Sequence, residues 1–135
     1  MIPTEITTVP LSEQRYPTLG DYYYKDGKRI LKITSTGNDL YDDIILVHEL
    51  IEEILTRHKG IKEDDILKFD LWVEEEIKKG YYPDDGEPGE HPKSPYRREH
   101  GLSQIVEALM LNHLDIPFKQ YNDDIFKTFV DANNK

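Results

Sequence analysis

The chain has 135 residues, a length that favours one domain over residues 1–135 with a hydrophobic core of its own. Charged residues make up 33% of the chain and the formal net charge is −10. This balance argues against nucleic acid or an anionic membrane as a partner, because both attract clustered Lys and Arg. There is no cysteine, so disulfides and thiolate metal sites are excluded, and any metal would have to be held by His, Asp or Glu.

The first residues of the chain show no targeting signal. Residues 1–5 lack the basic and apolar segments of a signal peptide. No apolar run approaches the roughly 20 residues that are needed to cross a bilayer. We therefore expect a cytoplasmic protein.

The N-terminal part of the chain has the pattern of a β-hairpin. Residues 1–20 are rich in Pro and Thr, which predicts an extended lead-in. Two β-prone runs, residues 21–25 and 28–34, then flank Asp26 and Gly27. An Asp-Gly pair favours a tight hairpin turn because both residues of such a turn need positive φ.

Two helices are predicted next. Asn38 or Asp39 can cap the first helix, and Gly60 suits its C-terminal end, directly after the basic residues of the last turn. The second helix covers about residues 62–79, with acidic residues in its first turn and a stripe of apolar residues at helical spacing.

The remainder of the chain consists of a long loop and two more helices. Residues 81–95 form an acidic loop rich in Pro and Gly, and loops of this length in small domains are often functional. Helices are predicted over about residues 95–114 and, for a short one, from about residue 122. The expected fold is therefore α+β, with an N-terminal β-hairpin or small antiparallel sheet packed against three or four helices.

The stretch from His48 to Glu52 carries the clearest chemical signal. His48 and Glu52 are four residues apart, so on a helix they point the same way and can hold one metal ion. Glu49 lies beside them as a candidate catalytic base. The pattern H-E-x-x-E differs by one letter from H-E-x-x-H, the motif of zinc-protease helices, because Glu52 stands where the second His would be.

The apolar residues of the same helix leave two readings open. At about 100° per residue, His48 lies at the edge of a broad apolar arc, and Ile45 falls among the acidic residues beyond it. An isoleucine there indicates that protein partly covers the acidic face, and covered carboxylates need a partner or a cation. The alternative is an ordinary helix with Glu on its solvated side.

A metal site needs a third protein ligand, and the start of the third helix offers two. His100 shares a helix face with Ser103 and Glu107, whereas Glu99 lies nearer the stripe of Leu102, Val106 and Met110, which is expected to be core. We favour His100, because imidazole is the commoner zinc ligand, with Glu107 as a partner that orients it; Glu99 is the alternative third ligand.

Three further histidines are weaker candidates. His58 is explained by its place at a helix C-terminus, His91 lies in the acidic loop and is expected to be solvated, and His113 has no partner at a suitable spacing.

Three sequence blocks occur together: residues 12–21, His48-Glu49-Leu50-Ile51-Glu52, and Pro95-Tyr96-x-x-Glu99-His100. In this order they resemble a family of small uncharacterised proteins from bacteriophages and their bacterial hosts, over most of the chain. The resemblance implies a bacterial cytoplasm as the location if the chain is phage-encoded, and no established activity. The central helix is also similar to the active-site helix of zincin-like metallopeptidases, and this likeness implies His48 and Glu52 as ligands and Glu49 as the base.

The leading hypothesis is a metal-binding, zincin-like protein that acts as a metal-dependent hydrolase, with zinc as the first expectation for the metal and a protein or peptide as a further partner. One rival is a magnesium site of nucleotide pyrophosphatase type, because Glu49-x-x-Glu52 matches the E-x-x-E of those helices. Another rival is a non-enzymatic phage accessory protein that binds a host protein through its acidic surface.

Overall fold

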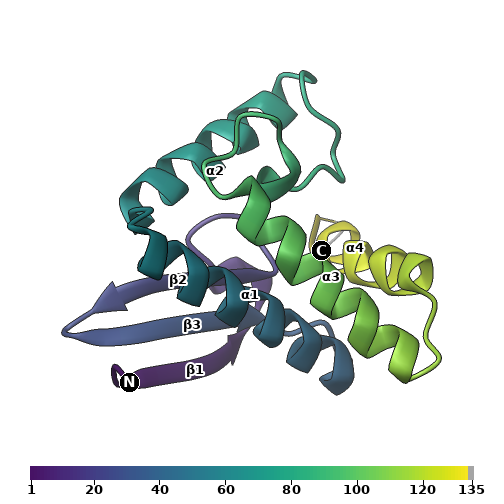
Figure 1. Ribbon diagram of the computed structural model, residues 1–135. Helices are drawn as coiled ribbons and strands as arrows, with labels where there is room; N and C mark the ends of the chain where they lie inside the picture. Colours follow the sequence, from purple (N-terminus) through teal and green to yellow (C-terminus); the bar gives the residue numbers. More distant parts are fainter. Residues whose placement is uncertain (134–135) are drawn as a thin grey trace.

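A three-stranded mixed sheet packs against four helices in this protein, so the predicted α+β class is confirmed (Figure 1). The computed structural model describes residues 1–133. Within this range, no helix has the length and apolar character that a membrane span requires.

The sheet has the order β1-β3-β2. Its strands are β1 (Thr4–Val9), β2 (Gly20–Lys25) and β3 (Lys28–Thr34). The predicted hairpin is confirmed: β2 and β3 are antiparallel, and Asp26 and Gly27 turn between them with φ of 52° and 75°. The expected lead-in contributes β1, which pairs in parallel with β3. Its Thr, Ile and Val side chains suit an edge strand, and the sheet is mixed rather than purely antiparallel as a result.

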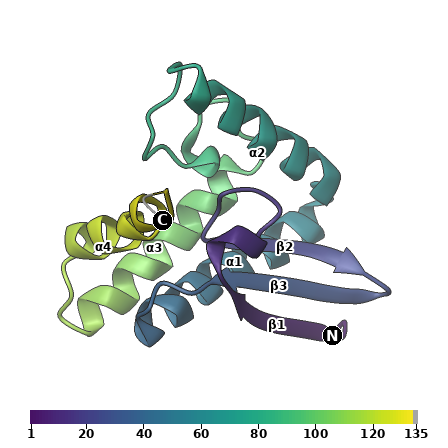
Figure 2. The ribbon, with the colours of Figure 1, turned by 180° about the vertical axis from the view of Figure 1, so that it is seen from behind.

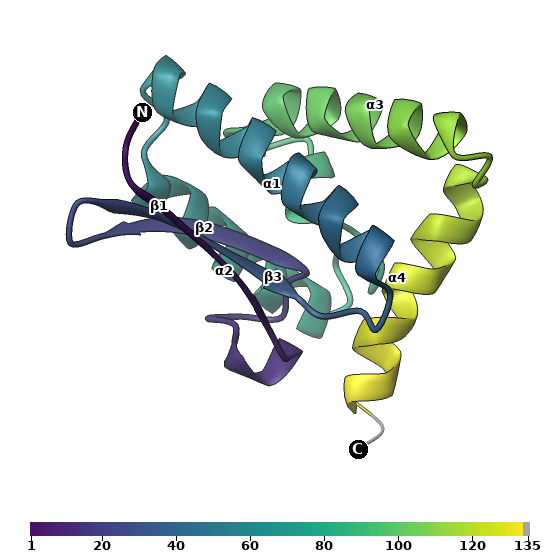
Figure 3. The same ribbon diagram turned by 90° about the horizontal axis from the view of Figure 1, so that it is seen from below.

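One face of the sheet is covered by α1 (Asp39–Lys59), as Figure 3 shows. The Asn38 side chain accepts a hydrogen bond from the Tyr41 amide at 3.1 Å, and Gly60 ends the helix with φ of 74°. Both caps match the sequence prediction. The buried Ile44 and Ile45 of α1 pack with Ile33 of β3 in the main hydrophobic cluster.

Of the remaining three helices, one packs against α1, one packs with side chains of the sheet, and the last in the chain contacts the helix that precedes it. They are α2 (Glu63–Lys78), α3 (Arg97–His113) and α4 (Phe118–Asn133). The loop between α2 and α3 contains a short 3-10 turn, Pro88–Glu90. The fourth helix begins four residues earlier than the position expected near Asn122, directly after Pro117, because proline is compatible with a helix start. In Figure 2 the connection between β1 and β2 lies between α2 and α4.

The predicted inner face of α3 is confirmed at one end and wrong at the other: Met110 packs against the main hydrophobic cluster, whereas Leu102 does not. Leu102 was expected in the core together with Val106 and Met110, but Leu102 is exposed, and the fully buried side chain at this part of α3 is Ser103. At its N-terminal end the helix turns polar side chains to the interior, because His100 and Glu107 find partners on α1 and on the long loop, and at its C-terminal end it buries Leu111 in the core.

Candidate metal centre

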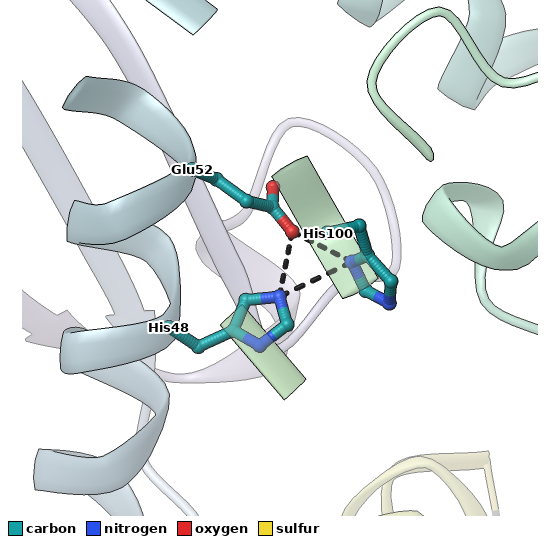
Figure 4. A group of neighbouring side chains, drawn as sticks. All are labelled: His48, Glu52 and His100. Carbon is teal, nitrogen blue, oxygen red and sulfur yellow. Dashed lines mark hydrogen bonds and ion pairs between the residues drawn. The ribbon is translucent and has the colours of Figure 1, made fainter. Parts of the chain in front are cut away.

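Helices α1 and α3 pack side by side and bring three buried side chains together, as Figure 4 shows. His48 and Glu52 come from consecutive turns of α1, and His100 comes from the first turns of α3. This is a buried His–Glu–His group that could bind a metal ion. The predicted pairing of His48 and Glu52, and their approach to His100, are therefore present in the structure.

Three atoms of this group converge on one point. Glu52 Oε2 lies 2.6 Å from His48 Nε2 and 2.6 Å from His100 Nδ1, and the two ring nitrogens are 3.2 Å apart. A tetrahedral zinc ion with bonds near 2.0 Å separates its ligand atoms by roughly 3.3 Å. The spacing of the nitrogens matches that geometry, whereas the carboxylate oxygen is at hydrogen-bond distance from both rings.

The outer nitrogen of each imidazole contacts a second carboxylate. His48 Nδ1 contacts Glu107 of α3, and His100 Nε2 lies 2.7 Å from Glu87 Oε2 in the long loop. Carboxylates in this position fix the orientation of metal-binding histidines. Glu107 was expected to contact His100, and it contacts His48 instead, because the two helices face each other across the group.

Glu87 is a site residue that sequence reasoning missed. Its carboxylate also accepts a hydrogen bond from Gln104 at 3.2 Å, so α3 holds this part of the loop. The main chain at Gly89 lies directly against the His100 ring: a Cβ atom there would be 2.3 Å from Cγ of the ring. The acidic loop therefore closes over His100 only with glycine at position 89.

The charges of the group are strongly coupled. Burial alone would raise the pKa of Glu52, but His48 and His100 outweigh it and lower that pKa to about 2. Burial alone would lower the pKa of His100, but Glu52 and Glu87 raise it to about 10. Burial alone would also lower the pKa of His48, but Glu52 and Glu107 raise it well above its ordinary value. Without a metal, the group therefore holds protons between its nitrogens and oxygens.

Glu49, the expected base, lies next to this group rather than in it. It is half-buried against β2, where a Cβ atom on Gly20 would be 2.3 Å from Glu49 Cγ. Burial, followed by the charge of Glu52, raises the pKa of Glu49 well above its ordinary value. Both Glu49 and the His–Glu–His group line the same cleft.

Glu99, the alternative third ligand, does not join the group. It is buried, and its carboxylate accepts a hydrogen bond from Lys59 at 2.6 Å. Adjacent residues on a helix point about 100° apart, so only one of Glu99 and His100 can face Glu52. In the structure it is His100 that faces Glu52.

The other histidines lie elsewhere. His58 and His113 are exposed at the C-terminal ends of their helices. His91, which was expected to be solvated, is partly exposed, and its ring packs against Trp72 and Tyr82 at centroid distances of 5.3 and 5.0 Å.

Near the His–Glu–His group, the buried carboxylate of Asp70 lies between two tyrosine hydroxyls. Asp70 of α2 accepts hydrogen bonds from Tyr16 at 2.5 Å and from Tyr96 at 2.7 Å. Tyr96 is the residue that precedes α3, and a third tyrosine, Tyr22, reaches Glu52 at 3.5 Å. Burial raises the pKa of Asp70 to about 7 although both hydroxyls favour its charged form. No spacing rule in the sequence connects residues so far apart.

The group opens into a cleft of about 870 Å³, a volume typical of sites for small molecules. One wall comes from α2, another from α4, and the segment before β2 lies between them. Carboxylates dominate the polar lining, and Arg15, the cleft's one Lys or Arg among residues 1–133, already pairs with Asp21 and Glu63. The cleft is therefore suited to cations.

Comparison with protein-family models, with curated proteins and with solved structures finds no match for this chain. The resemblance to phage proteins therefore stays a prediction from the three sequence blocks. The function of the protein has to be inferred from the geometry of the site.

Proposed function

We propose that this protein binds a divalent metal ion, with zinc as the first candidate, through His48, Glu52 and His100. The observation that carries the proposal is the convergence of three ligand atoms while the outer nitrogen of each ring contacts a separate carboxylate. This is the arrangement in which carboxylates orient histidines toward a metal.

The proton count of the group supports a cation at its centre. If each ring carries its proton on the outer nitrogen, facing Glu107 or Glu87, both inner nitrogens present lone pairs to each other and to Glu52. Three electron-rich atoms at such distances repel unless a proton or a metal ion lies among them. A metal ion satisfies all three at once, and protons must leave when it binds.

The proposal extends to hydrolysis. Three protein ligands leave a fourth position of a tetrahedral ion for water, whose pKa the ion would lower. Glu49 lies on the adjacent turn of the same helix and lines the same cleft, so it is the candidate to take the proton of that water. Support for this step is the shared cleft and the raised pKa of Glu49, together with the likeness to zincin helices.

Other metal chemistry has less support. Among residues 1–133, both groups that could hold an ion include His100. A magnesium site made of carboxylates alone, as in the nucleotide pyrophosphatase reading, therefore has no matching cluster in this part of the chain.

The metal proposal is tested on untagged protein that is stripped with a chelator and titrated with zinc. Wild type is expected to bind one equivalent, and His48→Ala to lose binding by about a thousandfold, because one of three ligands is removed. His58→Ala, an exposed histidine of the same helix, is the matched control and should bind like wild type. Absence of zinc binding by wild type contradicts the proposal and favours the acidic-surface accessory protein.

Catalysis is tested separately on zinc-loaded protein with a panel of fluorogenic peptides. Glu49→Gln should keep the metal and lose turnover by at least about a hundredfold, because an amide preserves shape but accepts no proton. If Glu49→Gln releases zinc, Glu49 is a ligand. If it keeps both zinc and turnover, Glu49 is not the base.

A further inference from the structure

The outer face of α3 is apolar and uncovered. Leu102, Ile105 and Leu109 are 46%, 58% and 64% exposed. At about 100° per residue, a single stripe within roughly 60° of Ile105 contains seven positions, and none of them is acidic: Arg98, Gly101, Leu102, Ile105, Ala108, Leu109 and Asn112. Single exposed leucines are ordinary, but an apolar stripe along a whole helix marks an interaction surface.

Among residues 1–133 of one copy, no contact accounts for the glycine in this stripe. Glycine in a helix is less stable than alanine, and a Cβ atom on Gly101 would meet nothing within 4 Å. Gly101 and Ala108 are seven residues apart, so both small residues lie on the same side of the stripe. Small residues two turns apart let the backbone of another helix approach closely.

We propose that α3 is the interface of a homodimer, in which two copies of the helix pack antiparallel about a two-fold axis near Ile105. In a two-fold interface the same surface of each copy meets itself, so that surface must be complementary to itself. The stripe on α3 meets this requirement. Rotation about Ile105 places Leu102 opposite the partner's Ala108, and Gly101 opposite the partner's Leu109. Each leucine therefore faces the space that a small residue leaves.

Charge complementarity selects a second copy as the occupant. In the antiparallel arrangement, Arg98 lies opposite the partner's Asn112, next to the C-terminal end of the partner's α3. The carbonyl groups at a helix C-terminus carry partial negative charge, and Asp115 follows directly after that end. Elsewhere two copies with a net charge of −10 each would repel, whereas this stripe contains no carboxylate. An anionic membrane would meet the same repulsion from the whole chain.

This inference does not depend on the proposed metal chemistry, because His100 and Glu107 occupy the opposite face of α3. Its test is the mass of the full chain by sedimentation velocity between 1 and 100 µM, a range set by roughly micromolar affinities of modest interfaces. Wild type is expected to be dimeric at the upper end. Ile105→Glu should be monomeric throughout, with a dissociation constant at least about a hundredfold weaker, because it places two carboxylates together at the axis.

Leu71→Glu is the matched control. Leu71 is 42% exposed on α2, outside the stripe, and its substitution should leave the dimer unchanged. Circular dichroism checks that each variant is folded. A wild type that stays monomeric at 100 µM overturns the proposal, and so does a dimer that survives Ile105→Glu.

Gly101→Ala tests whether Gly101 lies in the dimer interface, because it should affect the stability of the chain and the affinity of the dimer in opposite directions. It should raise the thermal midpoint of the isolated chain, because alanine is the better helix former, and weaken the dimer about tenfold or more, because its methyl group occupies the close approach. Arg98→Glu should also weaken the dimer, and high salt should reduce the difference between Arg98→Glu and wild type. If Gly101→Ala raises stability without changing the dimer, the antiparallel packing is wrong.

Discussion

The two faces of α3 reverse the usual distribution of residues. Its inner face buries His100, Ser103 and Glu107, and its outer face exposes Ile105 and Leu109. An ordinary surface helix does the opposite, because apolar burial is the main source of folding stability. The inner face is tolerated because each buried polar group has a partner: Ser103, for example, donates to the Glu99 carbonyl at 3.0 Å. The proposed metal site and the proposed dimer contact therefore lie on opposite faces of one helix.

The largest expected effect comes from Asp70 of α2, which accepts a hydrogen bond from Tyr96 directly before the start of α3. Burial raises its pKa to about 7 from an ordinary 3.8, so between pH 4 and 7 the folded protein keeps a proton that the unfolded chain releases. Stability should therefore fall as pH rises through this window, by up to roughly 4 kcal/mol. Asp70→Asn should flatten that part of the profile, measured by urea unfolding of the metal-free protein at pH 4, 5.5 and 7. Equal slopes in both proteins would show that Asp70 titrates normally.

A smaller effect is expected from the carboxylate that contacts His48. Glu107→Gln keeps the shape of the inner face but weakens the contact to the His48 ring, so zinc affinity should fall about ten- to a hundredfold. Competition with a chromophoric chelator measures it. Glu75→Gln is the control, because Glu75 is exposed on α2 and pairs with Lys78, outside the cleft. Unchanged affinity in Glu107→Gln would mean that Glu107 does not support the site.

The smallest effect is expected on the outer face. Leu109→Ser should change the unfolding free energy of the monomer by less than about 0.5 kcal/mol, because the side chain is already mostly in water. The measurement is chemical unfolding at low micromolar concentration. A loss above about 2 kcal/mol would show that this face is packed within one copy, and the contrast between the faces would disappear.

Local signals in the sequence predict much of this molecule. The Asp26-Gly27 turn and the Asn38 and Gly60 caps depend on backbone chemistry within a few residues, and the structure confirms them. The pairing of His48 with Glu52 follows from helix periodicity alone. These features need no knowledge of the rest of the fold.

The features that sequence reasoning missed all involve distant segments. The pairing of β1 with β3 and the hydrogen bonds of Asp70 to Tyr16 and Tyr96 join parts of the chain that no spacing rule connects. Leu102 was mispredicted as core because periodicity locates an apolar stripe but does not tell which side the rest of the protein covers. Glu87 could have been found only from the conformation of its loop.

Gly20 and Gly89 have a consequence for the shape of the site. At both positions main chain, rather than a side chain, touches a chemically important group: Gly20 lies against Glu49, and Gly89 lies against His100. A surface made of side chains can shift by rotamer changes within nanoseconds, whereas main chain has no rotamers. At Gly20 this main chain belongs to strand β2, so the shape of the cleft beside Glu49 is set by the sheet, whereas beside His100 it is set by the conformation of the long loop.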